Sequence, residues 1–148
     1  MTSDGAAARK VIAIYCDGGA RGNPGPAAVG AVVLDPTTSP PTRLATVSER
    51  IGVATNNVAE YSGLIGALAW AAANGISRLQ VRADSDLLVK QMRGEYRVKS
   101  PGLQPLFQQA RALARQVGHV TFEHVRRELN EDADRLANEA MDEAATRT

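Results

Sequence analysis

The chain lacks the features that mark secreted and membrane proteins. Its 148 residues include one cysteine, Cys16, so no disulfide can form within the chain. There is no run of about 20 apolar residues that could span a bilayer, and the opening MTSDGAAARK has no apolar stretch typical of a secretory signal. We therefore expect a cytoplasmic protein with no membrane partner, in which Cys16 is a small core residue and not a nucleophile.

Aromatic residues are also few, and the net charge is small. Aromatic side chains make up 4% of the chain and the formal net charge is +1, a near-neutral balance that excludes no class of partner. Basic residues are concentrated between Arg78 and Lys99, where they are compatible with a passing strand of phosphates. Hydrophobic residues make up 44% of the chain, enough for one domain with a single core. We assign this domain to residues 10–144, a flexible tail to 1–9 and a frayed end to 145–148.

Hydrophobic patterns predict that strands and helices alternate along the chain. Apolar segments predict strands at 11–17, 28–34, 43–51, 76–83 and 120–125. Helical spacing and stop signals predict helices at 57–73, 86–92, 103–117 and 130–144. This order predicts an α/β fold with a five-stranded mixed sheet, three antiparallel strands followed by two parallel ones, and helices on both faces.

Four acidic residues stand where the chain changes direction between these elements. They are Asp17, Glu60, Asp84 and Asp134. Hard divalent cations take several oxygen ligands, and an unneutralised acidic cluster repels itself. Carboxylates from four separate elements therefore suggest a divalent metal site.

Each of the four acids also has an ordinary local explanation. Asp17 precedes two glycines and could start a turn. If Asn57 caps its helix, Glu60 would complete a variant of the capping box. Asp84 or Ser85 could cap the short helix that follows, and Asp134 suits the positive end of a helix dipole. The acids taken singly do not establish a site.

The acids belong to four short motifs, and these motifs point to one family. The motifs are Asp17-Gly18 with GNPGP at 22–26, TNN at 55–57 with Glu60, Asp84-Ser85, and Asn130 with AD at 133–134 and LA at 136–137. All four occur in order and at workable separations. In this combination the chain resembles the type 1 ribonuclease H family from residue 11 to about residue 141.

The resemblance implies a ribonuclease H-like fold and a specific activity. That activity is endonucleolytic hydrolysis of the RNA strand of an RNA/DNA hybrid, which leaves 5'-phosphate and 3'-hydroxyl ends. Two Mg²⁺ ions, or Mn²⁺ as a substitute, would be held by the four acids. Asp17 would bridge both ions, Glu60 and Asp84 would complete one shell, and Asp134 would hold the other ion. We expect no small-molecule cofactor and a monomer.

The resemblance also implies residues that contact the substrate. It places Asn23, Asn56 and Asn57 in the minor groove, where an asparagine can serve either role of a 2'-hydroxyl partner. It places Thr55 on a phosphate of the DNA strand and Ser85 among the substrate contacts. Alternatives remain open, because Asn56 and Asn57 could only cap the helix and Asn23 could only shape a tight loop.

Two departures from the best-known family pattern place the chain in a compact branch. The loop before Asp134 has no histidine, so His119 and His124 are expected to be structural or exposed; Arg127 in that loop could contact a phosphate as a fixed cation. Only residues 93–99 connect Met92, at the end of the predicted helix 86–92, to Ser100 ahead of the predicted helix 103–117. The basic handle of other members is therefore absent, and modest affinity for the hybrid is expected.

Two other functions compete with this interpretation. The chain could be another nuclease or strand-transfer enzyme of the same broad fold, although the TNN element favours the hybrid-specific branch. It could also be a non-catalytic hybrid-binding module. The complete set of four acids argues against such a module, because four mutually repelling carboxylates without a metal would cost stability.

Overall fold

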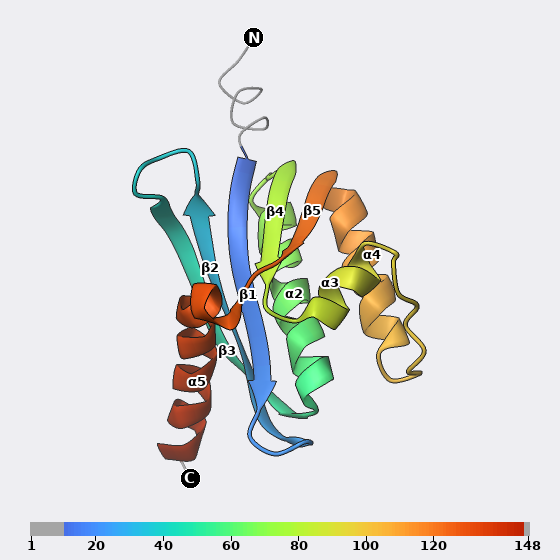
Figure 1. The fold of residues 1–148 in the computed structure, drawn as a ribbon. Helices are drawn as coiled ribbons and strands as arrows, with labels where there is room; N and C mark the ends of the chain where they lie inside the picture. Colours follow the sequence, from blue (N-terminus) through green and yellow to red (C-terminus); the bar gives the residue numbers. More distant parts are fainter. Residues whose placement is uncertain (1–10, 147–148) are drawn as a thin grey trace.

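A computed structural model describes residues 11–146 of the chain as a mixed sheet flanked by helices (Figure 1). The strands are β1 (Val11–Ala20), β2 (Gly25–Asp35), β3 (Thr42–Ala54), β4 (Arg78–Ala83) and β5 (His119–His124). The helices are α2 (Asn56–Ala73), α3 (Asp86–Met92), α4 (Gln104–Val117), the 3-10 turn η1 (Arg127–Asn130) and α5 (Glu131–Thr146). The expected tail at 1–9 and residues 147–148 of the expected frayed end lie outside the described residues.

The sheet has the topology that the sequence predicts. Its order is β3-β2-β1-β4-β5. The pairs β1–β2 and β2–β3 are antiparallel, whereas β1–β4 and β4–β5 are parallel. Helix α5 covers one face over β1, β2 and β3, and α2 covers the other face (Figure 1). The predicted α/β fold class with helices on both faces is confirmed.

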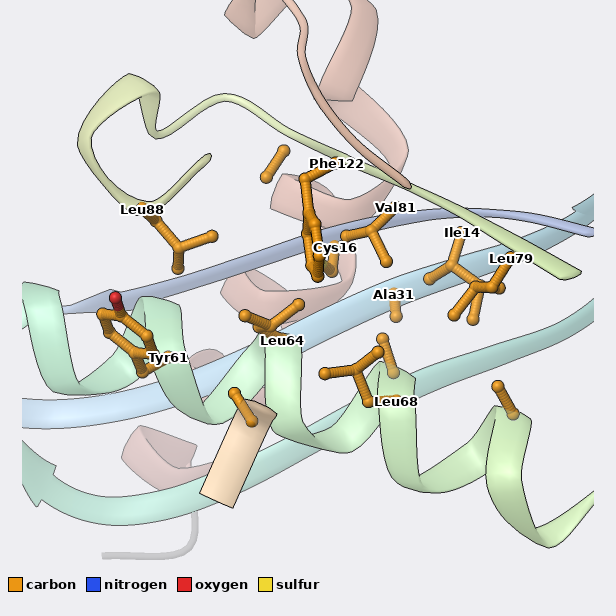
Figure 2. Packing of buried hydrophobic residues seen from close by; sticks show 14 of the residues in the cluster. Ile14, Cys16, Ala31, Tyr61, Leu64, Leu68, Leu79, Val81, Leu88 and Phe122 are labelled. Carbon is orange, nitrogen blue, oxygen red and sulfur yellow. The ribbon is translucent and has the colours of Figure 1, made fainter. Parts of the chain in front are cut away.

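The hydrophobic core lies between α2 and the central strands (Figure 2). Ile14 and Leu64 are fully buried within it, and burial of such side chains contributes about 1.5–3 kcal/mol each. The hydroxyl of Tyr61 donates a hydrogen bond of 2.5 Å to Oε1 of Gln91, so the polar atom of this buried ring has a partner. Cys16 is 2% exposed, and burial raises the pKa of its thiol to about 12. The prediction that Cys16 is a core residue agrees with both observations.

Glycines allow the helices to pack directly against the strands that carry the candidate site. A Cβ at Gly18 would collide with the carbonyl of Ala59 in α2, and one at Gly63 would lie 2.5 Å from the carbonyl oxygen of Asp17. A Cβ at Gly30 would meet α5 in the same way. These contacts pack α2 against β1 and α5 against β2 with no intervening side chain, so both helices lie at backbone distance from the sheet.

Within residues 11–146 we find no helix with the length and apolar character needed to cross a membrane.

Candidate active site

Four elements carry the acidic residues into one cleft. Asp17 lies in β1, Glu60 in the second turn of α2, Asp84 directly after β4 and Asp134 in the first turn of α5. All four line a cleft of about 310 Å³. The structure thus brings together the acids that the sequence singled out.

Strand pairing explains why two of these acids are neighbours. In the parallel register, Cys16 is paired with Ala83. Asp17 and Asp84 each follow one member of this pair, and adjacent strands lie about 4.8 Å apart, so the two acids are neighbours. The local alternative that Asp17 only starts a turn is wrong, because β1 continues to Ala20.

The charges in the cleft are not balanced by the protein. Burial raises the pKa of Asp17 to about 8, with further contributions from Asp84 and from a hydrogen bond with Asp134. Burial also raises the pKa of Glu60, and Asp84 adds to this effect, whereas Ser85 and Arg127 oppose it. A carboxyl group whose charged form is this disfavoured gains from a nearby cation.

The donor set suits a hard divalent ion. Mg²⁺ and Mn²⁺ prefer carboxylate and water oxygens, and the cleft offers four carboxylates from four elements. Among the residues that the structure describes, no three acidic, histidine or cysteine side chains are arranged as a ready-made metal centre. The fit to a cation therefore rests on the donor chemistry and on the shared cleft.

Two of the predicted substrate contacts also fix the glycine-rich loop after β1. Oδ1 of Asn23 accepts a hydrogen bond of 3.0 Å from the backbone N–H of Asn56, and Oδ1 of Asn56 accepts one of 2.9 Å from the N–H of Ala20. Asn56 lines the cleft, whereas Asn23 does not. The two amide oxygens thus have a structural role in fixing this loop.

Three other predicted contacts lie beside the cleft and do not line it. Thr55 caps α2, with its Oγ1 accepting a hydrogen bond of 3.2 Å from Val58 N–H. The alternative that Asn57 caps this helix is therefore wrong, and Asn57 is exposed in the first turn. Ser85 caps α3 and also hydrogen-bonds the carboxylate of Glu60. This second bond connects the end of β4 to α2.

Arg127 lines the cleft from η1, and the two histidines do not. Its charge lowers the pKa of Glu60, which places the guanidinium within electrostatic reach of that carboxylate. His119 and His124 are exposed on β5. The expectation that neither histidine belongs to the cleft agrees with this placement.

The sequence did not single out three residues with long side chains that also line the cleft. These are Arg21, Asn138 and Met141. Asn138 and Met141 follow Asp134 at helical spacing along α5, so the periodicity of this helix could have identified them. Arg21 stands within GGARGNPG, where no local pattern distinguishes it. Its guanidinium forms an ion pair of 2.5 Å with Asp142 of α5.

The mixed sheet with its cleft of four acids defines a ribonuclease H-like protein, and comparison with known proteins supports this class. A family model described as reverse transcriptase-like matches residues 15–140. RNase H1 from the halophilic archaeon Halobacterium salinarum NRC-1 is 42% identical, with a TM-score of 0.85, and the match covers 90% of this chain and 98% of that one. LC11-RNase H1, solved in complex with an RNA/DNA hybrid, is 44% identical with a TM-score of 0.83, and the match covers 90% and 99% of the two chains.

The chain therefore belongs to the type 1 ribonuclease H family. It is also 52% identical over 134 residues to the bifunctional protein Rv2228c of Mycobacterium tuberculosis, a match that covers 90% of this chain. The chain spans 36% of the length of that relative and 64% of the length of ribonuclease HI from Halobacterium salinarum.

Proposed function

We propose that this chain is an endoribonuclease that hydrolyses the RNA strand of RNA/DNA hybrids and leaves 5'-phosphate and 3'-hydroxyl ends. The observation that carries the proposal is the convergence of Asp17, Glu60, Asp84 and Asp134 in one cleft of a chain that belongs to the type 1 ribonuclease H family. A binding module would have no use for four carboxylates that repel a phosphate backbone.

The four acids would hold two Mg²⁺ ions, with Mn²⁺ as a substitute. Asp17 is central in this assignment because its carboxyl group interacts with both Asp84 and Asp134. When bound, such a pair of ions activates the attacking water and stabilises the leaving oxygen. Ser85 would orient the carboxylate of Glu60 through the hydrogen bond between them.

The remaining predicted residues would select the hybrid by its sugars and phosphates. Asn56 would donate from its amide nitrogen to a 2'-hydroxyl, which distinguishes RNA from DNA, and Asn23 would act beside it. Thr55 would contact a phosphate of the DNA strand, and the exposed Asn57 would reach the minor groove. Arg127 would contact a phosphate near the acids as a fixed cation.

We extend the proposal to the setting in which the enzyme acts. It would be a cytoplasmic monomer that needs divalent ions and no small-molecule cofactor. Its partner would be the hybrid, the ligand named for the complex of LC11-RNase H1.

The deciding experiment is a cleavage assay on three labelled substrates of one sequence: an RNA/DNA hybrid, duplex DNA and duplex RNA. Each is incubated with the protein in Mg²⁺, in Mn²⁺ and in EDTA. We expect metal-dependent cleavage of the RNA strand in the hybrid and little cleavage of duplex DNA. Equal cleavage of hybrid and duplex DNA would favour another nuclease of this fold, and binding of the hybrid without cleavage in either metal would favour a non-catalytic module.

A further inference from the structure

Arg21, which lines the cleft, forms an ion pair that joins the end of β1 to α5. It lies just after β1 and pairs with Asp142 of α5 at 2.5 Å. Arg21 and Arg127 are the two cationic residues among those that line the cleft. Asp142 is two helical turns beyond Asp134, about 12 Å along α5 from the rise per residue. The ion pair therefore lies at the end of the cleft that is farther from Asp134.

The backbone of Arg21 is fixed while its guanidinium is not buried. Its N–H donates a hydrogen bond of 2.8 Å to the carbonyl oxygen of Pro26, and the preceding residue, Ala20, is held by Asn56. A Cβ at Gly25 would collide with the carbonyl of Arg21, so the two sides of the loop are in backbone contact. The side chain of Arg21 is 44% exposed and that of Asp142 is 63% exposed. A long cationic side chain therefore extends from a rigid base into solvent at the cleft.

An ion pair this exposed contributes little to folding. Salt and water screen such a pair, and its formation changes an equilibrium constant by at most about fivefold. A phosphodiester offers the guanidinium two oxygens in a geometry that fits its planar fork. Neutralising a backbone phosphate also releases condensed counterions, which a carboxylate on the protein surface cannot provide. When Arg21 changes its partner from Asp142 to a phosphate, the lost ion pair therefore costs little and the new contact gains binding free energy.

We propose that Arg21 binds a backbone phosphate of the nucleic-acid substrate, and that Asp142 holds the guanidinium in an ion pair until the substrate displaces it. The inference rests on the proposed function, since it names a second cation beside Arg127 for the same cleft. Asp142 then acts as a competitor that lowers affinity, and it does so only through Arg21.

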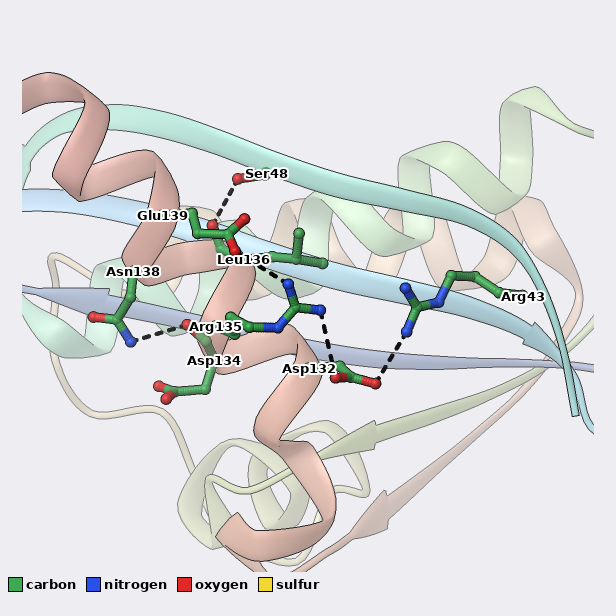
Figure 3. A network of polar contacts seen from close by, with 8 residues as sticks. All are labelled: Arg43, Ser48, Asp132, Asp134, Arg135, Leu136, Asn138 and Glu139. Carbon is green, nitrogen blue, oxygen red and sulfur yellow. Dashed lines mark hydrogen bonds and ion pairs between the residues drawn. The ribbon is translucent and has the colours of Figure 1, made fainter. Parts of the chain in front are cut away.

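A second ion pair in the protein provides a matched control. Arg43 of β3 pairs with Asp132 of α5 at 3.1 Å, and the two side chains are 49% and 57% exposed. Figure 3 shows this pair extended through Arg135, with the carboxylate of Asp134 pointing away from the three side chains. Arg43 and Asp132 also join α5 to the sheet, but they do not line the acidic cleft. Substitutions of Arg43 and Asp132 remove the same types of charge as substitutions of Arg21 and Asp142, but they do not touch the proposed phosphate contact.

The test is a binding cycle measured by fluorescence anisotropy with a labelled RNA/DNA hybrid over a series of salt concentrations. All proteins carry Asp84→Asn to block cleavage, and Arg21→Ala, Asp142→Asn and the double variant are compared with Arg43→Ala and Asp132→Asn. We expect Arg21→Ala to weaken binding about five- to tenfold and to reduce the slope of log K against log salt by about 0.7–0.9, the value for one phosphate contact. We expect Asp142→Asn to strengthen binding about two- to fivefold when Arg21 is present.

The double variant decides whether Asp142 acts through Arg21. We expect Asp142→Asn in the Arg21→Ala background to change affinity no more than Asp132→Asn does. An unchanged salt slope in Arg21→Ala, or the same gain from Asp142→Asn with and without Arg21, would overturn the inference. The wild-type cleavage assay separates the two proposals: if the hybrid is not cleaved, the proposed function fails, and if it is cleaved while the cycle shows no coupling, only the role of Arg21 fails.

Discussion

Two consecutive residues of α2 face opposite regions of the protein. Glu60 faces the acidic cleft and Tyr61 faces the hydrophobic core. Burial raises the pKa of both side chains, that of Tyr61 to about 12. The hydroxyl of Tyr61 keeps its proton and donates a hydrogen bond to Gln91. Glu60 instead shares its cleft with Asp84, whose charge raises the pKa of Glu60 further.

The two regions differ in how their polar groups are satisfied. Those of the core find partners within the protein, whereas the carboxylates of the cleft repel one another. Core side chains gain free energy from burial, and their polar atoms find partners within the fold. The carboxylates of the cleft are held close together at a cost to stability, as expected of residues kept for function. Substitutions in the cleft should therefore reduce activity and spare stability, and substitutions in the core should do the reverse.

The largest effect is expected from Asp84→Asn, which removes one charge from the cleft with little change in shape. We expect the rate of hybrid cleavage to fall at least about a thousandfold, equivalent to about 4 kcal/mol of transition-state stabilisation. The melting temperature should stay the same or rise, because one repulsive charge is lost. Cleavage rates in Mg²⁺ and thermal unfolding in EDTA measure the two quantities. The control is Asp86→Asn, which removes an exposed carboxylate that pairs with Lys90 at 3.0 Å; a variant of Asp84 that keeps most activity would remove this residue from the site.

The opposite pattern is expected from Leu64→Ala in the core. Leu64 has no exposed surface, and its truncation should lower the free energy of unfolding by about 2–5 kcal/mol through lost burial and a residual cavity. Urea denaturation measures this loss. Cleavage per folded molecule, assayed at a temperature where the variant remains folded, should be close to that of the wild type. A large loss of cleavage in the fully folded variant would contradict the separation of core and cleft.

The sequence predicted most of the fold because apolar periodicity and turn residues act locally. The helix α3 has the predicted bounds, Asp86–Met92. The strands β1 and β2 were predicted too short at the ends that face each other. Those ends consist of small residues at 18–20 and 25–27, which carry no hydrophobic pattern. Antiparallel pairing such as Gly18 with Val29 and Ala20 with Ala27 makes them strands, and such pairing is a tertiary effect.

The candidate site was predicted where its residues belong to motifs and missed where they do not. Asp17 and Asp134 could be placed together because the resemblance joined motifs that lie far apart in the sequence. The ion pair between Arg21 and Asp142 connects residues 121 positions apart, and no local spacing encodes it. The η1 turn was also missed: the last helix was predicted to begin at Asn130, which instead ends η1 ahead of α5. This turn brings Arg127 to the cleft.

Substitutions of two glycines of α2 test the contact between this helix and β1, where the core and the cleft meet. A Cβ at Gly63 would lie 2.5 Å from the carbonyl oxygen of Asp17, whereas a Cβ at Gly66 would meet nothing within 4 Å. We expect Gly63→Ala to push α2 from β1, to lower the free energy of unfolding by about 1–3 kcal/mol and to reduce cleavage. Gly66→Ala should be stabilising by up to about 1 kcal/mol, because alanine favours a helix over glycine. Unfolding and cleavage of both variants are compared; equal behaviour of the pair would show that the contact with Asp17 does not position the acid.

The last effect concerns stability alone: it is a change in the pH dependence of stability in Asp17→Asn, measured without metal. The pKa of Asp17 is raised from its ordinary value of 3.8 to about 8 in the folded protein. The folded state therefore binds this proton more tightly than the unfolded state, and the stability that it gives is lost as pH rises from about 4 to about 8. Asparagine carries no such charge, so the variant should be more stable than the wild type above pH 8 and should lose this advantage toward pH 4. Thermal unfolding in EDTA across this range measures the difference, and parallel curves for the two proteins would show that the buried charge of Asp17 does not lower stability.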